Sequence, residues 1–381
     1  METKELGIYI HIPFCKKKCY YCDFISYQGK SDKIEKYIET ICLEIENWKR
    51  STNIKQYNVT SIYIGGGTPS YIEPKHISKI LKHLNEFINK NVEITIEVNP
   101  GTVINSKLEK YKEAGINRLS IGLQETHDEL LKTIGRIHTY EEFLNTYNWA
   151  RGAGFKNINI DLMIGLPNQT IQDIKESLEK VLKLKPEHIS VYSLILEEGT
   201  KLEKQIEKGN LILPDEDTER AMYWYVKNTL EKSGLKHYEI SNFASEGKES
   251  KHNMNCWNQK QYRGFGIAAH SYIEGLRFSN TSILEEYIEN IKKEDYSQNI
   301  RVHERQTPDI MKKEYMLLGL RKLEGVSITD FKNKYKENPL FLFKSELDDL
   351  VKQKLIIVGG EKIKLTSKGL DLANLVWEKF V

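Results

Sequence analysis

The segment FCKKKCYYCDF, residues 14–24, places three cysteines within eight residues. Cys15, Cys19 and Cys22 have the spacing C-x3-C-x2-C, and the two other cysteines of the chain, Cys42 and Cys256, lie outside this segment. A disulfide uses two thiols, and a closed zinc site usually takes four ligands. Three cysteines therefore raise the question of what they bind and what completes the site.

Thiolates are soft ligands that suit zinc, copper(I) or iron–sulfur clusters. Three cysteines on a four-iron cluster would leave one iron open to a substrate or cofactor. The alternative is a zinc ion with Cys42 or a histidine as its fourth ligand. Cys42 lies between two apolar residues of an amphipathic segment, where a buried thiol is common, so the residues favour a cluster.

The composition is that of an ordinary globular protein of 381 residues, with a formal net charge of +2. A net charge this small does not indicate that the protein binds nucleic acid or a membrane. No apolar run approaches the roughly 18 residues that span a bilayer, and residues 1–7 lack the apolar region of a signal peptide. We therefore expect a cytoplasmic protein, in which a tight cysteine cluster indicates metal or redox chemistry.

Six short β-branched runs alternate with amphipathic segments in the first 200 residues. The runs cover 8–12, 59–64, 92–98, 118–122, 158–163 and 188–194. Segments between them, such as 31–50 and 74–89, repeat apolar residues at the helical period. This alternation predicts an α/β fold with a parallel sheet covered by helices, either doubly wound or a partial (β/α) barrel.

The unusual residues of these units come directly after the strands. The cysteine segment follows the first run, GGGTP (65–69) follows the second, and EVNP (97–100), GLQ (122–124) and DLMIGLP (161–167) end the next three. Parallel α/β folds build their active sites at this edge. Glycine lets a ligand approach the backbone closely, and the carboxylates of Glu97 and Asp161 can accept hydrogen bonds from ribose hydroxyls.

The pattern changes after about residue 200, and we divide the chain into residues 1–200, 201–300 and 301–381. The middle part contains a predicted helix (215–233), a predicted strand (238–243) and the segment HNMNCWN (252–258), which is expected to form a loop. The last part reads as three helices, a hairpin at Gly359-Gly360 and a final helix over 367–380, similar to a winged helix.

A zinc-stabilised nucleic-acid binder is a hypothesis that the winged-helix pattern raises. A DNA-reading unit concentrates basic residues on its recognition helix. The corresponding segment here, 344–352, contains Glu346, Asp348 and Asp349. We therefore expect no nucleic-acid partner.

The C-x3-C-x2-C segment after a first strand, with Tyr21 before its last cysteine, resembles the radical S-adenosylmethionine (SAM) superfamily. The resemblance implies a partial (β/α)6 TIM-like barrel, with a [4Fe-4S] cluster on Cys15, Cys19 and Cys22 and SAM on the open iron. It also implies one-electron cleavage of SAM. The SAM contacts that it implies are Tyr9, Tyr21, Gly66, Gly67, Thr68, Glu97, Gln124, Arg136 and Asp161.

The segments at 9–15, 65–69, 97–100 and 161–167 are similar to one branch of that superfamily, the coproporphyrinogen oxidase-like proteins. This branch holds oxygen-independent coproporphyrinogen III oxidases and the HemW heme chaperones. The oxidases carry a further cysteine where this chain has Phe24, and an N-terminal extension that we expect this chain to lack. Both differences favour the chaperones, and radical decarboxylation of coproporphyrinogen III is the alternative.

The chaperones carry a His-Asn-x-x-Tyr-Trp motif linked to heme, and residues 252–257 resemble it. The resemblance assigns His252, Asn253 and Trp257 to heme, whereas Cys256 stands where tyrosine is expected. Histidine, cysteine and methionine are common axial ligands of heme iron, although a satisfied histidine and a buried tryptophan would also explain the segment. The implied partners are heme or porphyrin, a reductant protein and a heme-accepting apo-protein, membrane-associated acceptors included.

Overall fold

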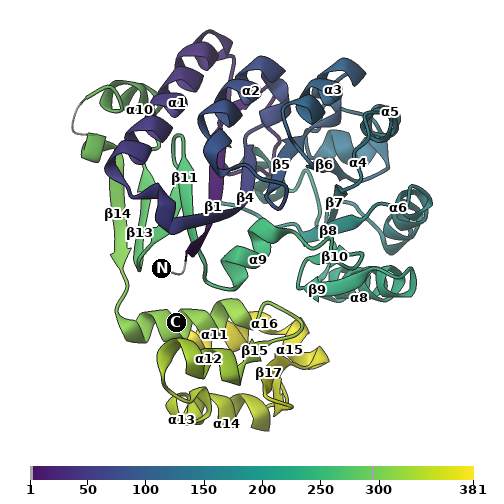
Figure 1. Cartoon of the computed structure of the whole chain (residues 1–381). Coiled ribbons are helices and arrows are strands. Elements are labelled where there is room, and N and C mark those ends of the chain that lie inside the picture. Colours follow the sequence, from purple (N-terminus) through teal and green to yellow (C-terminus); the bar gives the residue numbers. More distant parts are fainter. Residues whose placement is uncertain (1–2, 294–295) are drawn as a thin grey trace.

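The computed structural model describes residues 3–293 and 296–381 (Figure 1). Its main element is a twelve-stranded sheet with the order β14-β13-β12-β11-β1-β4-β5-β6-β7-β8-β10-β9. The central six strands are parallel and neighbour one another in chain order. These strands are β1 (Lys4–Ile12), β4 (Tyr57–Gly66), β5 (Glu93–Val98), β6 (Arg118–Gln124), β7 (Ile158–Ile164) and β8 (His188–Ser193).

A doubly wound sheet reverses its strand order at a switch point. The central strands here keep one direction of order, so the partial-barrel prediction is confirmed. The helices lie along the outside of the sheet (Figure 1). They are α1 (Ile34–Ser51), α2 (Pro74–His83), α3 (Asn105–Glu113), α4 (Asp128–Thr133), α5 (Tyr140–Gly152), α6 (Ile171–Lys183) and α8 (Glu216–Lys232). The short helix α7 (Lys201–Glu207) follows β8 and contacts the cysteine loop at 15–22, since the Leu202 N–H donates to the Tyr20 carbonyl.

Alternation along the strands separates the core from the interior of the barrel. Ile8, Ile10 and Ile12 of β1 are fully buried and belong to the main hydrophobic cluster with residues of the outer helices. Tyr9, between them, is only partly buried and lies beside Tyr63 of β4. Because side chains alternate across a sheet, apolar residues pack outward against the helices and polar residues gather inside the barrel.

The sheet continues beyond the six predicted units on both edges. Next to β1 it adds β11 (Gln261–Phe265), parallel, and then β12 (His270–Ile273), β13 (Leu276–Asn280) and β14 (Ile300–Arg305), antiparallel. A short helix α10 (Leu284–Asn290) lies between β13 and β14 in the chain, and β2 (Phe14–Cys15) pairs with β3 (Tyr27–Gln28) in a small separate sheet.

Two expectations for the middle of the chain are wrong. Residues 238–243 form a hairpin, β9 (Lys236–Glu239) and β10 (Asn242–Ala244), because Ile240 and Ser241 form a two-residue turn between them. The predicted loop at 252–258 contains the helix α9 (Lys251–Trp257). Ser250 caps this helix, since its side-chain oxygen accepts the Asn253 N–H at 3.3 Å.

The C-terminal part has its own hydrophobic cluster, which includes Met316, Phe331, Leu350 and Ile363. The predicted order of three helices and a hairpin is present, but Leu372 interrupts the predicted last helix, where the backbone leaves helical geometry. The elements are α11 (Pro308–Gly319), β15 (Val326–Ser327), α12 (Ile328–Tyr335), α13 (Pro339–Leu342), α14 (Lys344–Lys352), β16 (Ile356–Gly359), β17 (Lys362–Leu365), α15 (Ser367–Asp371) and α16 (Ala373–Trp377). The three-part division of the chain stays a prediction.

No helix in residues 3–293 and 296–381 combines the length and apolar character needed to cross a bilayer.

One buried carboxylate joins α1 to the added strands. Glu44 is 1% exposed, and its two oxygens accept hydrogen bonds from Arg263 (2.9 Å), Asn280 (2.8 Å), Tyr287 (2.6 Å) and the Gly266 N–H (2.9 Å). The four donors come from β11, β13, α10 and the turn after β11. A buried charge is tolerated when it is paired and fully hydrogen-bonded, so Glu44 fixes the position of this edge of the sheet.

Replacing Glu44 should therefore destabilise the protein strongly. We expect Glu44→Ala to lower the free energy of unfolding by about 3–5 kcal/mol, because it leaves the Arg263 charge buried without its partner. Glu39→Ala, a change on the exposed face of the same helix, should stay within about 0.5 kcal/mol. Urea denaturation measures both, and a loss below about 1 kcal/mol for Glu44→Ala would contradict this account.

Candidate cofactor site

A cavity of about 460 Å³ opens at the carboxyl ends of the parallel strands. It is lined by all three predicted cluster cysteines and by every predicted SAM residue except Tyr9. The predicted residues that it brings together are Cys15, Cys19, Cys22, Tyr21, Gly66, Gly67, Thr68, Glu97, Gln124, Arg136 and Asp161. Residues from five strands and three loops thus converge on one space.

The cysteine loop, residues 15–22, is held by contacts from both sides. Thr68 Oγ1 donates to Cys15 Sγ at 3.4 Å, and Arg136 Nη1 donates to Cys19 Sγ at 3.6 Å. The Cys22 N–H donates to the Cys19 carbonyl at 3.4 Å. Burial raises the pKa of the Cys15 thiol and raises that of Cys22 to about 11. Both thiols are therefore neutral at pH 7, and a metal would displace their protons on binding.

The donor set fits an iron–sulfur cluster. Among the described residues, no three His, Cys, Asp or Glu side chains converge on a point that one metal ion could occupy. A four-iron cluster instead binds its cysteines through different irons, so its ligands border a volume, and the three thiols border the cavity. Cys42, the alternative fourth ligand, lies in α1 beside Lys79 and is not part of the cavity lining.

The glycine loop, residues 65–69, is hydrogen-bonded directly to the chain that leads into the cysteine loop. The Gly67 N–H donates to the Ile12 carbonyl and the Thr68 N–H to the Phe14 carbonyl, both at 2.9 Å. Gly66 has a φ of +111°, and a Cβ added there would lie 2.6 Å from the His11 ring. A Cβ added at Gly67 would lie 3.0 Å from Cys15 Sγ. Side chains at these two positions would displace the loop or fill the cavity.

Two partly buried carboxylates face the cavity. Glu97 accepts hydrogen bonds from Tyr63 Oη (2.9 Å) and the Gly66 N–H (3.1 Å), and burial raises its pKa to about 7. Burial also raises the pKa of Asp161, although Asn159 (2.7 Å) and Ser120 (3.1 Å) donate to it. Two desolvated acids close together favour a ligand that brings positive charge or hydroxyl donors.

Gln124 and Arg136 carry polar atoms that have no partner in the described part of the chain. Arg136 Nη2 donates to the Gly122 carbonyl at 2.6 Å, but its Nε is buried without an acceptor. Gln124 has a φ of +67°, and its side-chain oxygen is buried without a donor. A buried polar group without a partner is costly, so these atoms indicate that a polar ligand completes the site.

The two predicted tyrosines lie at different depths. Tyr21 lines the cavity and packs on Ile134 and Met163. Tyr9 lies deeper in the barrel, where its hydroxyl bonds His11 Nδ1 at 3.0 Å, and it does not line the cavity. The cavity is also lined by side chains that the sequence did not indicate, among them Tyr63, Ser120, Met163, Tyr192 and Ile195. The alternation of strands could have found the first three, which lie two residues from Gly65, Gly122 and Asp161.

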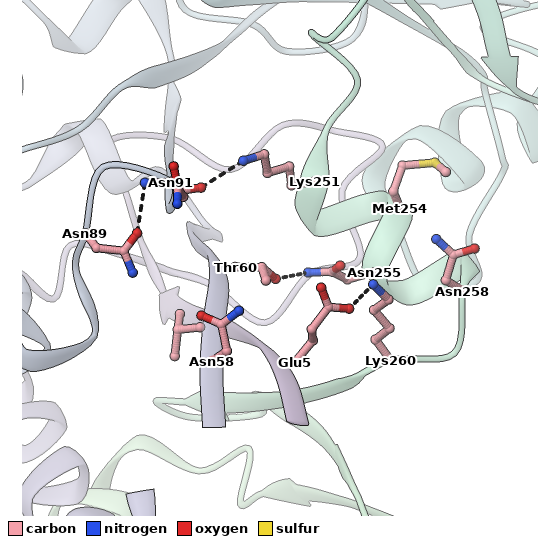
Figure 2. A pocket seen from close by; sticks show the side chains of 11 residues that line it. Glu5, Asn58, Thr60, Asn89, Asn91, Lys251, Met254, Asn255, Asn258 and Lys260 are labelled. Atoms are coloured by element: carbon pink, nitrogen blue, oxygen red, sulfur yellow. Dashed lines mark hydrogen bonds and ion pairs between the residues drawn. The ribbon is translucent and has the colours of Figure 1, made fainter. Parts of the chain in front are cut away.

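Helix α9 closes the opposite, amino-terminal end of the barrel (Figures 1 and 2). Figure 2 shows Asn255 donating to Thr60 of β4 at 2.8 Å and Lys251 donating to the Asn91 carbonyl at 2.8 Å. Glu5 of β1 pairs with Lys260 just after the helix. These polar contacts line a cavity of about 410 Å³ and fix α9 beneath β1 and β4.

From this helix His252 points into the barrel. Its Nδ1 lies 3.2 Å from Ser61 Oγ, and its ring stacks on Tyr63 with centroids 5.1 Å apart. Burial, with a smaller effect from the Arg118 charge, lowers the pKa of His252 to about 4. The imidazole is therefore neutral at pH 7, which is the form that can bind a metal.

The structure does not bring together His252, Asn253 and Trp257, the three residues that the resemblance assigns to heme. Trp257 points away from the barrel, and the Arg321 guanidinium lies between its ring and that of Trp377, 4.3 Å and 4.9 Å from their centroids. Asn253 is partly exposed, and its backbone N–H donates to Ser250 Oγ at the start of the helix. Cys256 is buried enough to raise its pKa to about 11, near Arg277.

Comparison with known proteins is consistent with this geometry. The radical SAM superfamily matches residues 9–181, and the HemN C-terminal domain matches residues 307–372. The chain is 39% identical to the heme chaperone HemW of Bacillus subtilis, covering 98% of both chains, and 37% identical to that of Lactococcus lactis, covering 100% of this chain and 98% of the relative.

A solved structure shares the fold over the whole chain. The coproporphyrinogen III oxidase HemN of Escherichia coli superposes with a TM-score of 0.85 at 24% identity, covering 100% of this chain and 90% of that one. Likeness at this level of identity concerns the fold alone. The full-length relatives decide the narrower group: the chain belongs to the radical SAM superfamily and, within it, to the HemW family.

Proposed function

We propose that this protein is a heme chaperone that binds heme together with a SAM-ligated [4Fe-4S] cluster and passes the heme to an acceptor apo-protein. The observation that carries the proposal is the full-length similarity to several proteins named heme chaperone HemW, at 33–39% identity. The cavity supports the proposal, because its lining contains the thiols that a [4Fe-4S] cluster needs and the carboxylates and unpartnered polar atoms that SAM needs.

In this proposal Cys15, Cys19 and Cys22 hold the cluster, and SAM occupies the cavity beside them. When bound, the cluster supplies an open iron for SAM and one electron for its cleavage. The glycine loop offers backbone groups to the amino acid part of SAM, and Glu97 and Asp161 accept from its hydroxyl and ammonium donors. Arg136 donates to Cys19 Sγ, and a cation at this thiolate would stabilise the negative charge of the site.

We place the heme near His252, the neutral imidazole of α9. Its Nδ1 is engaged with Ser61, whereas no hydrogen bond involves Nε2 in the described residues. This nitrogen is therefore free to bind iron. Trp257 would act through the position of the helix, because its ring packs on Arg321, and Asn253 through its backbone N–H, which donates to Ser250. A reductant protein and the acceptor apo-protein complete the proposal, and the cytoplasm is the proposed location.

A second candidate function is oxygen-independent oxidation of coproporphyrinogen III. The fold shared with HemN favours it, but Phe24, whose side chain is 62% exposed at the cavity, occupies the position of the oxidases' additional cysteine. The two functions predict different results with the same reconstituted protein.

The anaerobically reconstituted protein should bind about one heme per chain and leave coproporphyrinogen III unconverted. His252→Ala should weaken heme binding by about tenfold or more, which corresponds to about 1.4 kcal/mol of binding free energy, because it removes the proposed iron ligand. His83→Ala, on the outer helix α2, should leave the affinity unchanged. Heme titration by absorption measures this, and conversion of coproporphyrinogen to protoporphyrinogen at a catalytic rate would overturn the chaperone proposal.

The cluster should depend on the loop cysteines and not on Cys42. We expect Cys19→Ser to lose the visible absorption of the cluster and its iron, about four per chain in the unmodified protein. Cys42→Ser replaces a buried thiol of α1 and should keep both signals. Iron analysis and absorption spectra test the pair, and a colourless unmodified protein that contains zinc would contradict the assignment.

The glycine loop should tolerate no side chain. Gly66→Ala should weaken SAM binding at least tenfold, because the new Cβ would meet the His11 ring beside the cavity. Gly115→Ala is a matched control, since Gly115 also has a positive φ (+95°) but open space around it. Calorimetric titration with SAM measures both affinities, and the control shows how much of any loss comes from backbone strain alone. Equal affinities for the two variants would refute the role of the loop.

A further inference from the structure

A chain of hydrogen bonds in the wall of the barrel ends on the Asp161 carboxylate. Asn159 Nδ2 donates to Asp161 Oδ1 at 2.7 Å, and Ser120 Oγ donates to Asp161 Oδ2 at 3.1 Å. Asn159 Nδ2 also donates to Ser120 Oγ at 2.8 Å. Asn159 and Ser120 are buried, whereas Asp161 is partly exposed and lines the cofactor cavity. Two buried, uncharged donors therefore set the direction in which this carboxylate meets the cavity.

The surroundings of Asn159 leave its side-chain amide one orientation. Its nitrogen faces the Asp161 carboxylate, which only accepts when ionised, and the Ser120 oxygen, whose hydrogen is directed to Asp161. Its oxygen Oδ1 lies on the other side, where Ser190 Oγ donates at 3.1 Å and His188 Nδ1 lies at 2.6 Å. An acceptor oxygen at 2.6 Å requires a hydrogen on His188 Nδ1.

The His188 ring, on β8, is fully buried and has a single hydrogen to place. Burial, with a smaller effect from the Arg118 charge, lowers the pKa of His188 well below its usual value, so the ring is neutral at pH 7. With the hydrogen on Nδ1, Nε2 is an acceptor, and Tyr238 Oη donates to it at 2.8 Å. Tyr238 Oη in turn accepts the N–H of Ser250, the residue that caps α9, at 3.3 Å. Every hydrogen of the chain from Ser250 to Asp161 thus has a defined direction.

The position of this one ring hydrogen controls the far end of the chain. If His188 held its hydrogen on Nε2, Nδ1 would be an acceptor and would favour the amide nitrogen of Asn159. The Asn159 amide would then turn its oxygen toward the Asp161 carboxylate. Two acceptors would face each other with no hydrogen between them, which is costly for buried groups. The contacts of His188 therefore decide whether Asp161 is held by a donor or repelled.

We propose that His188 is a positioning residue for SAM, which acts through Asn159 to hold the Asp161 carboxylate in the direction that accepts hydrogen bonds from the ribose hydroxyls. The inference rests on the proposed function, because it needs SAM in the cavity that Asp161 lines. His188 does not line this cavity and acts at one remove from the ligand. It preorganises an acceptor before the ligand arrives, as an outer group does for a group that binds directly.

Two amide variants separate the two nitrogens of the ring. In His188→Asn the side-chain nitrogen takes the place of Nδ1, so the donor to Asn159 is kept and the contact with Tyr238 is lost. In His188→Gln the longer side chain brings the amide to the place of Nε2, so the contact with Tyr238 is kept and the donor to Asn159 is lost. His237→Gln is the control, because His237 is a buried histidine of β9 whose Nε2 bonds the Ile240 carbonyl instead.

Calorimetric titration of the anaerobically reconstituted proteins with SAM measures the effect. We expect His188→Gln to weaken SAM binding about tenfold or more, His188→Asn about threefold or less and His237→Gln not measurably, because only the first loses the donor that orients Asn159. Tyr238→Phe removes one hydroxyl from the same chain without adding a group to the core, and it should weaken SAM binding about threefold. This variant keeps the test decisive should His188→Gln fail to fold.

A SAM analogue without the two ribose hydroxyls distinguishes positioning from a structural role. Asp161 has no ribose hydroxyl to accept from in this analogue, so His188→Gln and Tyr238→Phe should bind it as the unmodified protein does, within about twofold. A structural role would instead lower the affinities for SAM and for the analogue by the same factor.

Equal SAM affinities for His188→Asn and His188→Gln would overturn the proposal, and so would an equal loss of affinity for SAM and the analogue in either His188→Gln or Tyr238→Phe. Failure of the proposed function is distinct, because it shows in the unmodified protein before any variant is compared. Absence of SAM binding there would overturn both proposals, whereas absence of heme binding would overturn the chaperone function and leave the SAM titrations to decide the role of His188.

Discussion

The site depends on the close contact between the glycine loop and the chain that leads into the cysteine loop. Gly67 approaches the Ile12 carbonyl, the Phe14 N–H and Cys15 Sγ so closely that a Cβ would lie about 3.0 Å from each. Two backbone hydrogen bonds, from Gly67 and Thr68, fasten the loops together. Because the first cysteine and the glycine loop share this contact, a proposed cluster and its SAM ligand would have one common frame, built from the ends of β1 and β4.

Desolvated polar groups inside the barrel destabilise the fold, and the apolar core outside the barrel offsets this loss of stability. Isoleucines of the strands pack against the helices in one continuous cluster, while Glu97 and Asp161 are desolvated enough to raise their pKa values. Within the described part of the chain, neither acid accepts a hydrogen bond from a lysine or an arginine. Desolvated acids and unpartnered amides in the interior lower the stability of the fold. They also form a preorganised site, because a ligand can supply the missing hydrogen bonds without further rearrangement of the protein.

Sequence patterns predicted the parts of the fold that repeat locally. The six parallel strands follow from β-branched runs between amphipathic helices, and the residues at their carboxyl ends converge as that topology requires. The hairpin at 236–244, the helix α9 and the strands β12–β14 escaped prediction, because they add to sheet edges or fill the barrel end through tertiary contacts. The depth of Tyr9 likewise depends on its neighbours His11 and Tyr63, which no local pattern specifies.

The segment 252–257 connects the two ends of the molecule physically. His252 stacks on Tyr63, Tyr63 bonds Glu97, and Glu97 lines the cofactor cavity, so a column of contacts runs from α9 to that cavity. On the other side of α9, Trp257 is held through Arg321 to Trp377 of the C-terminal part. A heme bound to His252 would therefore contact a helix that is fixed both to the barrel interior and to the C-terminal part. If heme displaced α9, both contacts would be strained, and one short helix would then couple heme binding to the C-terminal part and to the cofactor cavity.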